Sequence, residues 1–123
     1  MPSTRVLIVD DQPEFRQVAR DLLETRGYAV VAEAEGVVTA LEALGRCAPD
    51  AVLLDVGLGE ESGFDVARAL TDARPGLAVV LVSADDGYAC CALVRESGAC
   101  GFVPKARLVD ADLGTMWRQA GGA

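Results

Sequence analysis

Two adjacent acids, Asp10 and Asp11, directly follow an apolar run in the stretch "VLIVDDQPEFR", residues 6 to 16. Neighbouring carboxylates repel each other, which raises one of the two pKa values unless a positive charge lies between them. A divalent cation removes that repulsion. Mg²⁺ is a hard ion that keeps several waters and prefers one or two carboxylates together with phosphate oxygens. The pair therefore predicts a magnesium site at the end of a strand.

Three more polar side chains stand at the ends of other apolar runs. Asp55 follows "AVLL", Ser83 follows "VVLV", and Lys105 follows "GFVP". A single acid after a strand is usually a loop residue or a helix cap, and for Asp11 alone that interpretation is the better one. For Asp55 it is weaker, because the sequence offers this acid no evident capping role. Acids, a hydroxyl and an ammonium that share strand ends together indicate a reactive site.

The apolar pattern predicts strands that alternate with helices. Expected strands lie at 5–10, 28–34, 51–55, 77–83 and 100–103. Expected helices run from Pro13 to about 25, from 37 to 48, through 64–70, from 88 to 97 and from 108 to 119. Four of them should pack through shared apolar faces: Phe15, Val18, Ala19, Leu22 and Leu23; Val37, Leu41, Leu44 and Ala48; Phe64, Ala67 and Leu70; and Leu113 with Trp117.

This alternation over short links predicts an α/β fold, with helices on both faces of a parallel sheet in three layers, α/β/α. Residues 1–123 are expected to form one domain, because this length suits a single compact core. In such sheets ligands bind beyond the carboxyl ends of the strands. We therefore expect Asp10, Asp55, Ser83 and Lys105 to meet at one edge of the sheet.

The composition argues against several other classes of protein. A net charge of −8 disfavours direct binding to nucleic acid, whose affinity for proteins comes mainly from Lys and Arg. Apolar runs such as Leu77–Val82, six residues long, are too short for a signal peptide or a membrane span, so a cytoplasmic protein without membrane contact is expected. The cysteines at 47, 90, 91 and 100 have no C-x-x-C spacing and no histidine to complete a zinc site, so reduced apolar fillers are expected.

Four separated stretches, "VLIVDDQPEFR", "PDAVLLDVGLGEESGFDVARAL", "VVLVSADD" and "GACGFVPKARL", occur in this order along the chain. Together they resemble the receiver domain of two-component response regulators. The resemblance implies a flavodoxin-like sheet with strand order 2-1-3-4-5. It also implies a role for each matching residue: Asp55 accepts a phosphoryl group; Asp10, Asp11, Asp55 and the backbone carbonyl of Gly57 hold Mg²⁺; Ser83 and Lys105 contact the phosphoryl oxygens; Ser83 and Phe102 switch position on activation.

The function that the resemblance implies is phosphorelay signalling rather than catalysis on an external substrate. The donor would be a phosphohistidine of a sensor histidine kinase or a histidine phosphotransfer protein, and it must lie outside this sequence, which contains no histidine. The acyl phosphate would switch the conformation to control an output protein or domain. We expect the face formed by residues 88–119 to change and to support a weak homodimer.

Two positions depart from the family pattern. Gly59, four residues after Asp55, and Ala106, directly after Lys105, stand where proline is common. Glycine leaves the loop after Asp55 more flexible than proline would. A cis peptide after Lys105 is not assumed, because such bonds are essentially confined to proline.

Three alternative functions are weighed against this one. Gly57, Gly59 and Gly63 form G-x-G-x-x-x-G between a strand and a helix, a spacing compatible with a dinucleotide-binding domain. Glu60 and Glu61 in that loop, and its place after the third strand rather than the first, argue against it. A receiver-like binding module that never takes phosphate is the second alternative. A piece excised from a longer transcription regulator is the third.

Overall fold

Five parallel strands form the central sheet of the computed structural model, which describes residues 4–84 and 92–121. Their order is β2-β1-β3-β6-β7. The predicted order 2-1-3-4-5 is confirmed, because β4 and β5 form a separate two-stranded sheet. The strands of the central sheet are β1 (Arg5–Val9), β2 (Ala29–Ala34), β3 (Ala51–Asp55), β6 (Ala78–Ser83) and β7 (Gly101–Pro104).

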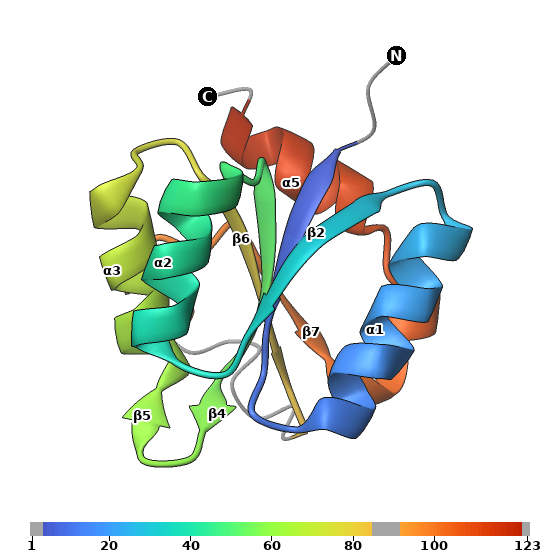
Figure 1. The fold of residues 1–123 in the computed structure, drawn as a ribbon, viewed down its shortest axis with the longest axis horizontal. Coiled ribbons are helices and arrows are strands. Elements are labelled where there is room, and N and C mark those ends of the chain that lie inside the picture. The colour runs from blue at the N-terminus through green and yellow to red at the C-terminus, as the bar shows by residue number, and fades with distance from the viewer. Residues whose placement is uncertain (1–3, 85–91, 122–123) are drawn as a thin grey trace.

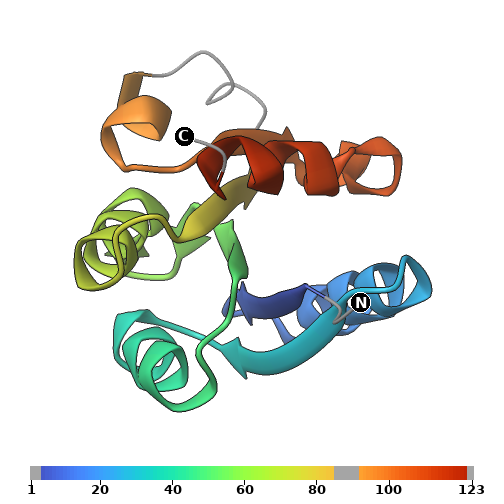
Figure 2. The ribbon, with the colours of Figure 1, turned by 90° about the horizontal axis from the view of Figure 1, so that it is seen from above.

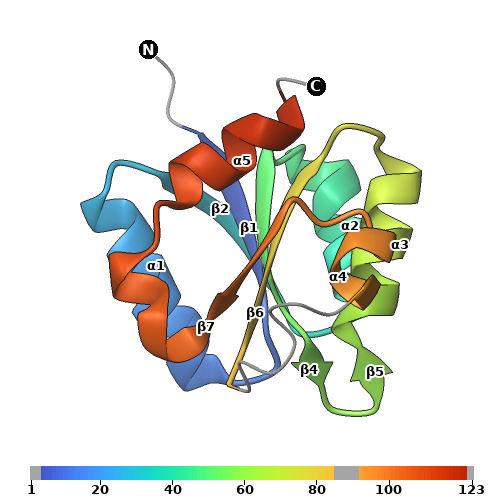
Figure 3. The ribbon, with the colours of Figure 1, turned by 180° about the vertical axis from the view of Figure 1, so that it is seen from behind.

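Helices cover both faces of this sheet, as the three-layer prediction requires. One side carries α1 and α5, and the other carries α2, α3 and α4 (Figures 1 and 2). Seen from behind, α5 lies across one face of the sheet, and α4 lies next to α3 (Figure 3). The helices are α1 (Pro13–Thr25), α2 (Val37–Cys47), α3 (Gly63–Ala73), α4 (Ala92–Glu96) and α5 (Leu113–Gly121), with a 3₁₀ helix, η2 (Lys105–Asp110), before α5.

The core consists of two apolar layers separated by the sheet. In β1, Val6 and Ile8 pack toward α1 and α5, whereas Leu7 and Val9 pack toward α2 and α3. Successive side chains of a strand point to opposite faces, so a strand buried on both faces reads as one continuous apolar run. The uninterrupted apolar sequences of β1, β3 and β6 therefore follow from their position inside the three layers.

The predicted packing faces are partly wrong for two helices. Val18 is 56% exposed and Leu41 is 38% exposed, although both were expected to face the core. The buried residues of α1, Ala19 and Leu23, were both part of the predicted face, and Val18 lies about 100° from Ala19 around the helix. In α2 the buried residues are Ala40, Ala43 and Leu44, of which only Leu44 was predicted. Ala48, also expected in the core, is the exposed residue that follows α2.

The expected helix over 108–119 is two separate elements. Residues 105–110 form η2, and α5 starts at Leu113. The break follows from Asp112, whose carboxylate accepts hydrogen bonds from the Thr115 backbone N–H at 3.1 Å and hydroxyl at 2.7 Å, as a helix cap does. The predicted burial of Leu113 and Trp117 is confirmed. The Trp117 indole N–H donates to the Val52 carbonyl at 3.2 Å.

Other expectations about local structure meet mixed outcomes. The helix expected over 88–97 is described only from Ala92, so Tyr88, Cys90 and Cys91 lie outside the described residues. Cys47 and Cys100 are free thiols, as predicted. No described peptide bond is cis, including the one after Lys105. Across residues 4–84 and 92–121, none of the helices combines the length and apolar character that a membrane crossing needs.

The start of α3 packs directly on the end of β3 because Gly63 has no side chain. A Cβ at this position would lie 2.2 Å from the main-chain oxygen of Asp55, which neither backbone can accommodate without moving. We expect Gly63→Ala to lower the free energy of unfolding by about 3 kcal/mol, as measured by urea denaturation. Gly45→Ala, in the middle of α2 with open space around it, is the matched control and should stabilise by up to about 1 kcal/mol. A Gly63→Ala protein as stable as the wild type would contradict this account.

Candidate functional site

The carboxyl ends of β3 and β6 and the residue after β7 border a pocket of about 450 Å³. Asp55, Ser83 and Lys105 line it, together with Gln12 and Gly57. Parallel strands end at a common edge, and the predicted polar residues are the last or next residues of their strands. The structure therefore brings together side chains that are up to about a hundred residues apart in the sequence.

Three carboxylates meet at this edge. Asp10, Asp11 and Asp55 each offer an oxygen, and these oxygens all lie within 4.8 Å of one another. Asp10 is fully buried and Asp55 is 5% exposed, whereas Asp11 is exposed. Negative groups held this close, two of them away from water, repel strongly unless cations neutralise them.

The Asp10 carboxylate has one satisfied oxygen and one that suits a cation. Its Oδ1 accepts a hydrogen bond from the Gln12 backbone N–H at 2.8 Å. Its Oδ2 is buried and has no hydrogen bond, although the Lys105 ammonium lies 2.8 Å away. This contact is an ion pair that lacks the geometry of a hydrogen bond. This buried oxygen has no hydrogen bond and lies beside two more carboxylates. Such a site suits a hard cation with oxygen ligands, such as Mg²⁺.

Lys105 places its ammonium between two of the acids. Its Nζ lies 2.8 Å from Asp10 Oδ2 and 3.5 Å from Asp55 Oδ2, and the side chain is 14% exposed. The ammonium also lies 4.1 Å from the ring centroid of Phe15, a cation–π distance. A single ammonium compensates only part of the negative charge of the three carboxylates. The remaining charge favours binding of a second cation.

Asp55 carries the clearest electrostatic signature of the site. Burial, followed by the negative charge of Asp10, raises the pKa of Asp55 above its ordinary value, and Lys105 opposes the rise only in part. Its Oδ1 accepts a hydrogen bond from the Gly57 backbone N–H at 3.3 Å. A partly desolvated carboxylate at the mouth of a pocket is a candidate for nucleophilic chemistry.

The two residues predicted to switch lie on neighbouring strands. Ser83 is the last residue of β6, is 6% exposed and lines the pocket. Phe102 lies on β7 opposite Leu81 and is partly buried against the core layer of α2 and α3. Their positions are compatible with the predicted relay, which stays a prediction.

Comparison with known proteins decides the family. The model of the response regulator receiver domain matches residues 6–112. This chain belongs to that family. The receiver domain is a component of two-component signalling, and the acidic cluster at the carboxyl edge of its sheet is where a receiver would bind Mg²⁺.

Individual relatives agree with this assignment. A sensory transduction protein, LytT of Bacillus cereus, is 38% identical over 86 residues, which cover 69% of this chain and 35% of that protein. A protein-glutamate methylesterase/protein-glutamine glutaminase of Hahella chejuensis is 36% identical over 102 residues, which cover 81% of this chain and 29% of that protein. A LuxR-family two-component response regulator of Aurantimonas has a TM-score of 0.82 at 31% identity, covering 94% of this chain and 86% of that one. The receiver domain spans less than half the length of the curated relatives it matches.

The glycine-rich loop of this receiver domain does not support the dinucleotide alternative. Residues 57–62 form a hairpin of β4 (Gly57–Leu58) and β5 (Glu61–Ser62), with Gly59 at its turn in a left-handed conformation, φ 64°. The Glu61 carboxylate accepts a hydrogen bond from the Val37 backbone N–H at 3.0 Å, at the start of α2. This loop is thus a hairpin anchored to α2 by an acidic side chain, and it is not the open glycine turn into α3 that a pyrophosphate would need.

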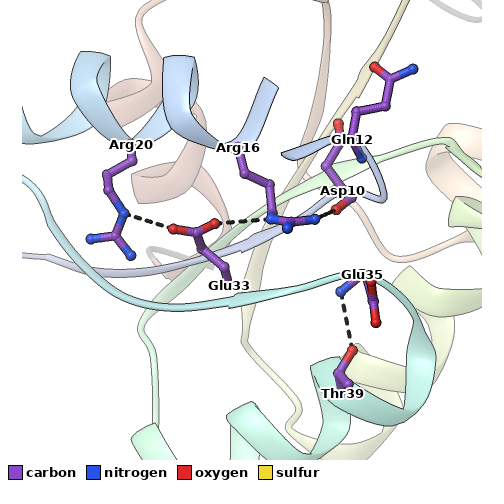
Figure 4. Close-up of polar contacts among 7 residues, drawn as sticks. All are labelled: Asp10, Gln12, Arg16, Arg20, Glu33, Glu35 and Thr39. Carbon is purple, nitrogen blue, oxygen red and sulfur yellow. Dashed lines mark hydrogen bonds and ion pairs between the residues drawn. The ribbon is translucent and has the colours of Figure 1, made fainter. Parts of the chain in front are cut away.

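Some residues around the site were missed or misread from the sequence. Phe15 packs against the core as expected, but its second contact, with the Lys105 ammonium, was missed. Gln12, which lines the pocket and donates to Asp10, gave no sequence signal. The same holds for Arg16 and Glu33, which join α1 and β2 to the end of β1 (Figure 4).

Proposed function

We propose that Asp55 accepts a phosphoryl group from a phosphohistidine of a sensor histidine kinase or a histidine phosphotransfer protein. The observation that carries the proposal is the buried Asp55 carboxylate at the pocket, 3.5 Å from the Lys105 ammonium and clustered with Asp10 and Asp11. Family membership supports the same reaction. The histidine donor lies outside this sequence, which contains none.

Each named residue has a defined task in the proposed transfer. Asp55 attacks phosphorus, so that a P–O bond forms while the P–N bond of phosphohistidine breaks and its electron pair returns to the imidazole nitrogen. Lys105 and the Ser83 hydroxyl bind the phosphoryl oxygens as charge is redistributed over them. Asp10, Asp11, Asp55 and the Gly57 carbonyl would hold Mg²⁺, which supplies charge neutralisation when bound. Attack of water on phosphorus later breaks the P–O bond and restores the carboxylate.

The downstream part of the proposal is a change of surface. A phosphoryl group next to Ser83 adds charge and acceptor oxygens, which draws the end of β6 toward Asp55. Phe102, on the adjacent β7, then turns inward. The proposed face, residues 88–119, includes exposed Leu93 and Val109 in its described part and is suited to an output partner or a weak homodimer. The cytoplasmic location and the single-domain boundary stay predictions.

Incubation with acetyl phosphate tests the proposal without any partner protein. In the presence of Mg²⁺ we expect intact-mass analysis to show one added phosphoryl group, because acetyl phosphate also carries an activated phosphoryl group, whose P–O bond breaks as acetate leaves. Chelation of Mg²⁺ with EDTA should prevent the addition, and re-addition of the ion should restore it. Absence of an adduct on a protein that calorimetry shows to bind Mg²⁺ would reject the proposal.

A further inference from the structure

Arg16 is a link between the acidic cluster and the neighbouring strand. It lies in α1, and its Nη1 donates a hydrogen bond to the main-chain carbonyl of Asp10 at 2.6 Å. Its Nε forms an ion pair with Glu33 Oε1 on β2 at 3.0 Å. Figure 4 shows this guanidinium lying between the two acidic residues. One rigid, planar group thus joins the end of β1, the start of α1 and the end of β2.

Glu33 is itself fixed in place. Its second oxygen, Oε2, pairs with Arg20 Nε at 2.8 Å. Burial tends to raise the pKa of Glu33, but the hydrogen bonds and charges of Arg20 and Arg16 outweigh it and hold this pKa below its ordinary value. Glu33 therefore stays ionised at neutral pH and presents one oxygen to each guanidinium. Arg16 is held from one side while it holds Asp10 from the other.

The hydrogen bonds of Asp10 leave one of its oxygens, Oδ2, in a position to bind a metal ion. Its N–H donates to the Ala34 carbonyl at 3.0 Å, its carbonyl accepts from Arg16, and its Oδ1 accepts from Gln12. Among the described contacts, Oδ2 has no hydrogen bond, and its partner is the Lys105 ammonium in the ion pair at 2.8 Å. The two peptide planes that flank the Cα of Asp10 are thus each held by a hydrogen bond, which restricts where Oδ2 can point.

We propose that Arg16 is a positioning residue for the metal-binding acids and acts through the main chain of Asp10. This inference rests on the proposed function, because it concerns Mg²⁺ bound by Asp10. Mg²⁺ demands near-ideal octahedral geometry, so its affinity depends on the placement of each carboxylate oxygen. The planar fork of arginine donates in two directions at once, which a lysine ammonium on a flexible stem does not reproduce.

Electrostatics and positioning make opposite predictions for removal of this residue. Loss of a positive charge near a cation site should by itself strengthen Mg²⁺ binding. Loss of a residue that orients a metal ligand should weaken it, typically by about tenfold or more. Arg20 provides the matched control, because it carries the same charge and pairs with the same Glu33 but has no described contact with Asp10.

The test is a calorimetric titration of the wild type, Arg16→Ala, Arg16→Lys and Arg20→Ala with Mg²⁺ and with Ca²⁺. We expect Arg16→Ala to weaken Mg²⁺ binding about tenfold and Arg16→Lys to weaken it several-fold, with Arg20→Ala within about twofold of the wild type. Ca²⁺ tolerates irregular geometry, so its affinity should fall less than that of Mg²⁺ in both Arg16 variants.

The outcomes separate this inference from the function on which it rests. A wild type that binds Mg²⁺ together with Arg16 variants that bind it equally well or better overturns the positioning role alone. An equal loss in Arg20→Ala also overturns it, since the effect would then belong to Glu33 or to general charge. A wild type that binds no Mg²⁺ overturns both claims. If Arg16→Ala does not fold, Arg16→Lys, which keeps the charge and most of the stem, decides.

Discussion

Asp55→Asn is expected to abolish phosphorylation by acetyl phosphate. The adduct formed in a fixed time should fall by at least about a hundredfold, because an amide oxygen is a far poorer nucleophile than a carboxylate. The reaction is followed by intact-mass analysis at saturating Mg²⁺. Asp55 is the acid whose replacement should abolish the reaction, because it is buried beside Lys105 and lines the pocket. An adduct that forms on the variant at the rate of the wild type would assign the reaction to another residue.

The same variant should be more stable than the wild type at neutral pH without metal. Burial and the charge of Asp10 raise the pKa of Asp55, so the folded protein binds this proton more tightly than the unfolded chain does. The protonated Asp55 carboxyl therefore contributes to the free energy of unfolding at acid pH, and this contribution is lost as the pH rises through the raised pKa. Asparagine cannot ionise and avoids that loss, which separates missing chemistry from misfolding.

Thermal unfolding at acid and at neutral pH measures this effect. The difference between Asp55→Asn and the wild type should be largest at neutral pH and should shrink toward acid pH, where the wild-type carboxyl is protonated too. Asp72→Asn, an exposed position in α3, makes the same change in net charge and should show no such difference. A variant less stable than the wild type at neutral pH would contradict the raised pKa.

Asp10→Asn is expected to weaken Mg²⁺ binding by about ten- to a hundredfold. The variant loses one unit charge next to the ion, an interaction worth several kcal/mol, and a water molecule that takes the place of the lost ligand recovers part of this energy. The replaced oxygen is buried and has no hydrogen bond, so its interaction with an ion is poorly screened by solvent. Phosphorylation should slow in parallel. Asp11→Asn should have a smaller effect, because Asp11 is exposed to water. Calorimetric titration with Mg²⁺ measures these affinities directly.

The control for this prediction is again Asp72→Asn. It lowers the net negative charge by the same amount and should leave Mg²⁺ binding within about twofold of the wild type, because a surface charge is screened by water and salt. If Asp10→Asn bound Mg²⁺ as tightly as the wild type while still folding, Asp10 would not be a metal ligand.

The sheet order and the convergence of the polar residues could be predicted from the sequence for a physical reason. Asp10, Asp55 and Ser83 end apolar runs, and parallel strands bring all such ends to one edge. The resemblance to receiver domains supplied the order of the strands, which periodicity alone does not specify.

Contacts between distant segments could not be predicted in the same way. The ring of Phe15 below Lys105 depends on how α1 packs on the sheet and on where the chain leads after β7, and apolar spacing reports only that Phe15 is partly buried. Val18 was assigned to the core together with its neighbour Ala19, because the periodicity tolerates an error of one position, and the structure buries only Ala19 of the two. The break before α5 did have a local signal, the spacing of Asp112 and Thr115, which is typical of a helix start.

The most direct test of the central claim is to locate the phosphoryl group on the chain. After reaction with acetyl phosphate and Mg²⁺, the protein is reduced with borohydride, which converts an aspartyl phosphate to homoserine, and its peptides are sequenced by mass spectrometry. The account predicts homoserine at position 55, with Asp10 and Asp11 unchanged. Homoserine at either of those two positions, or a phosphorylated protein in which Asp55 remains intact, would contradict it.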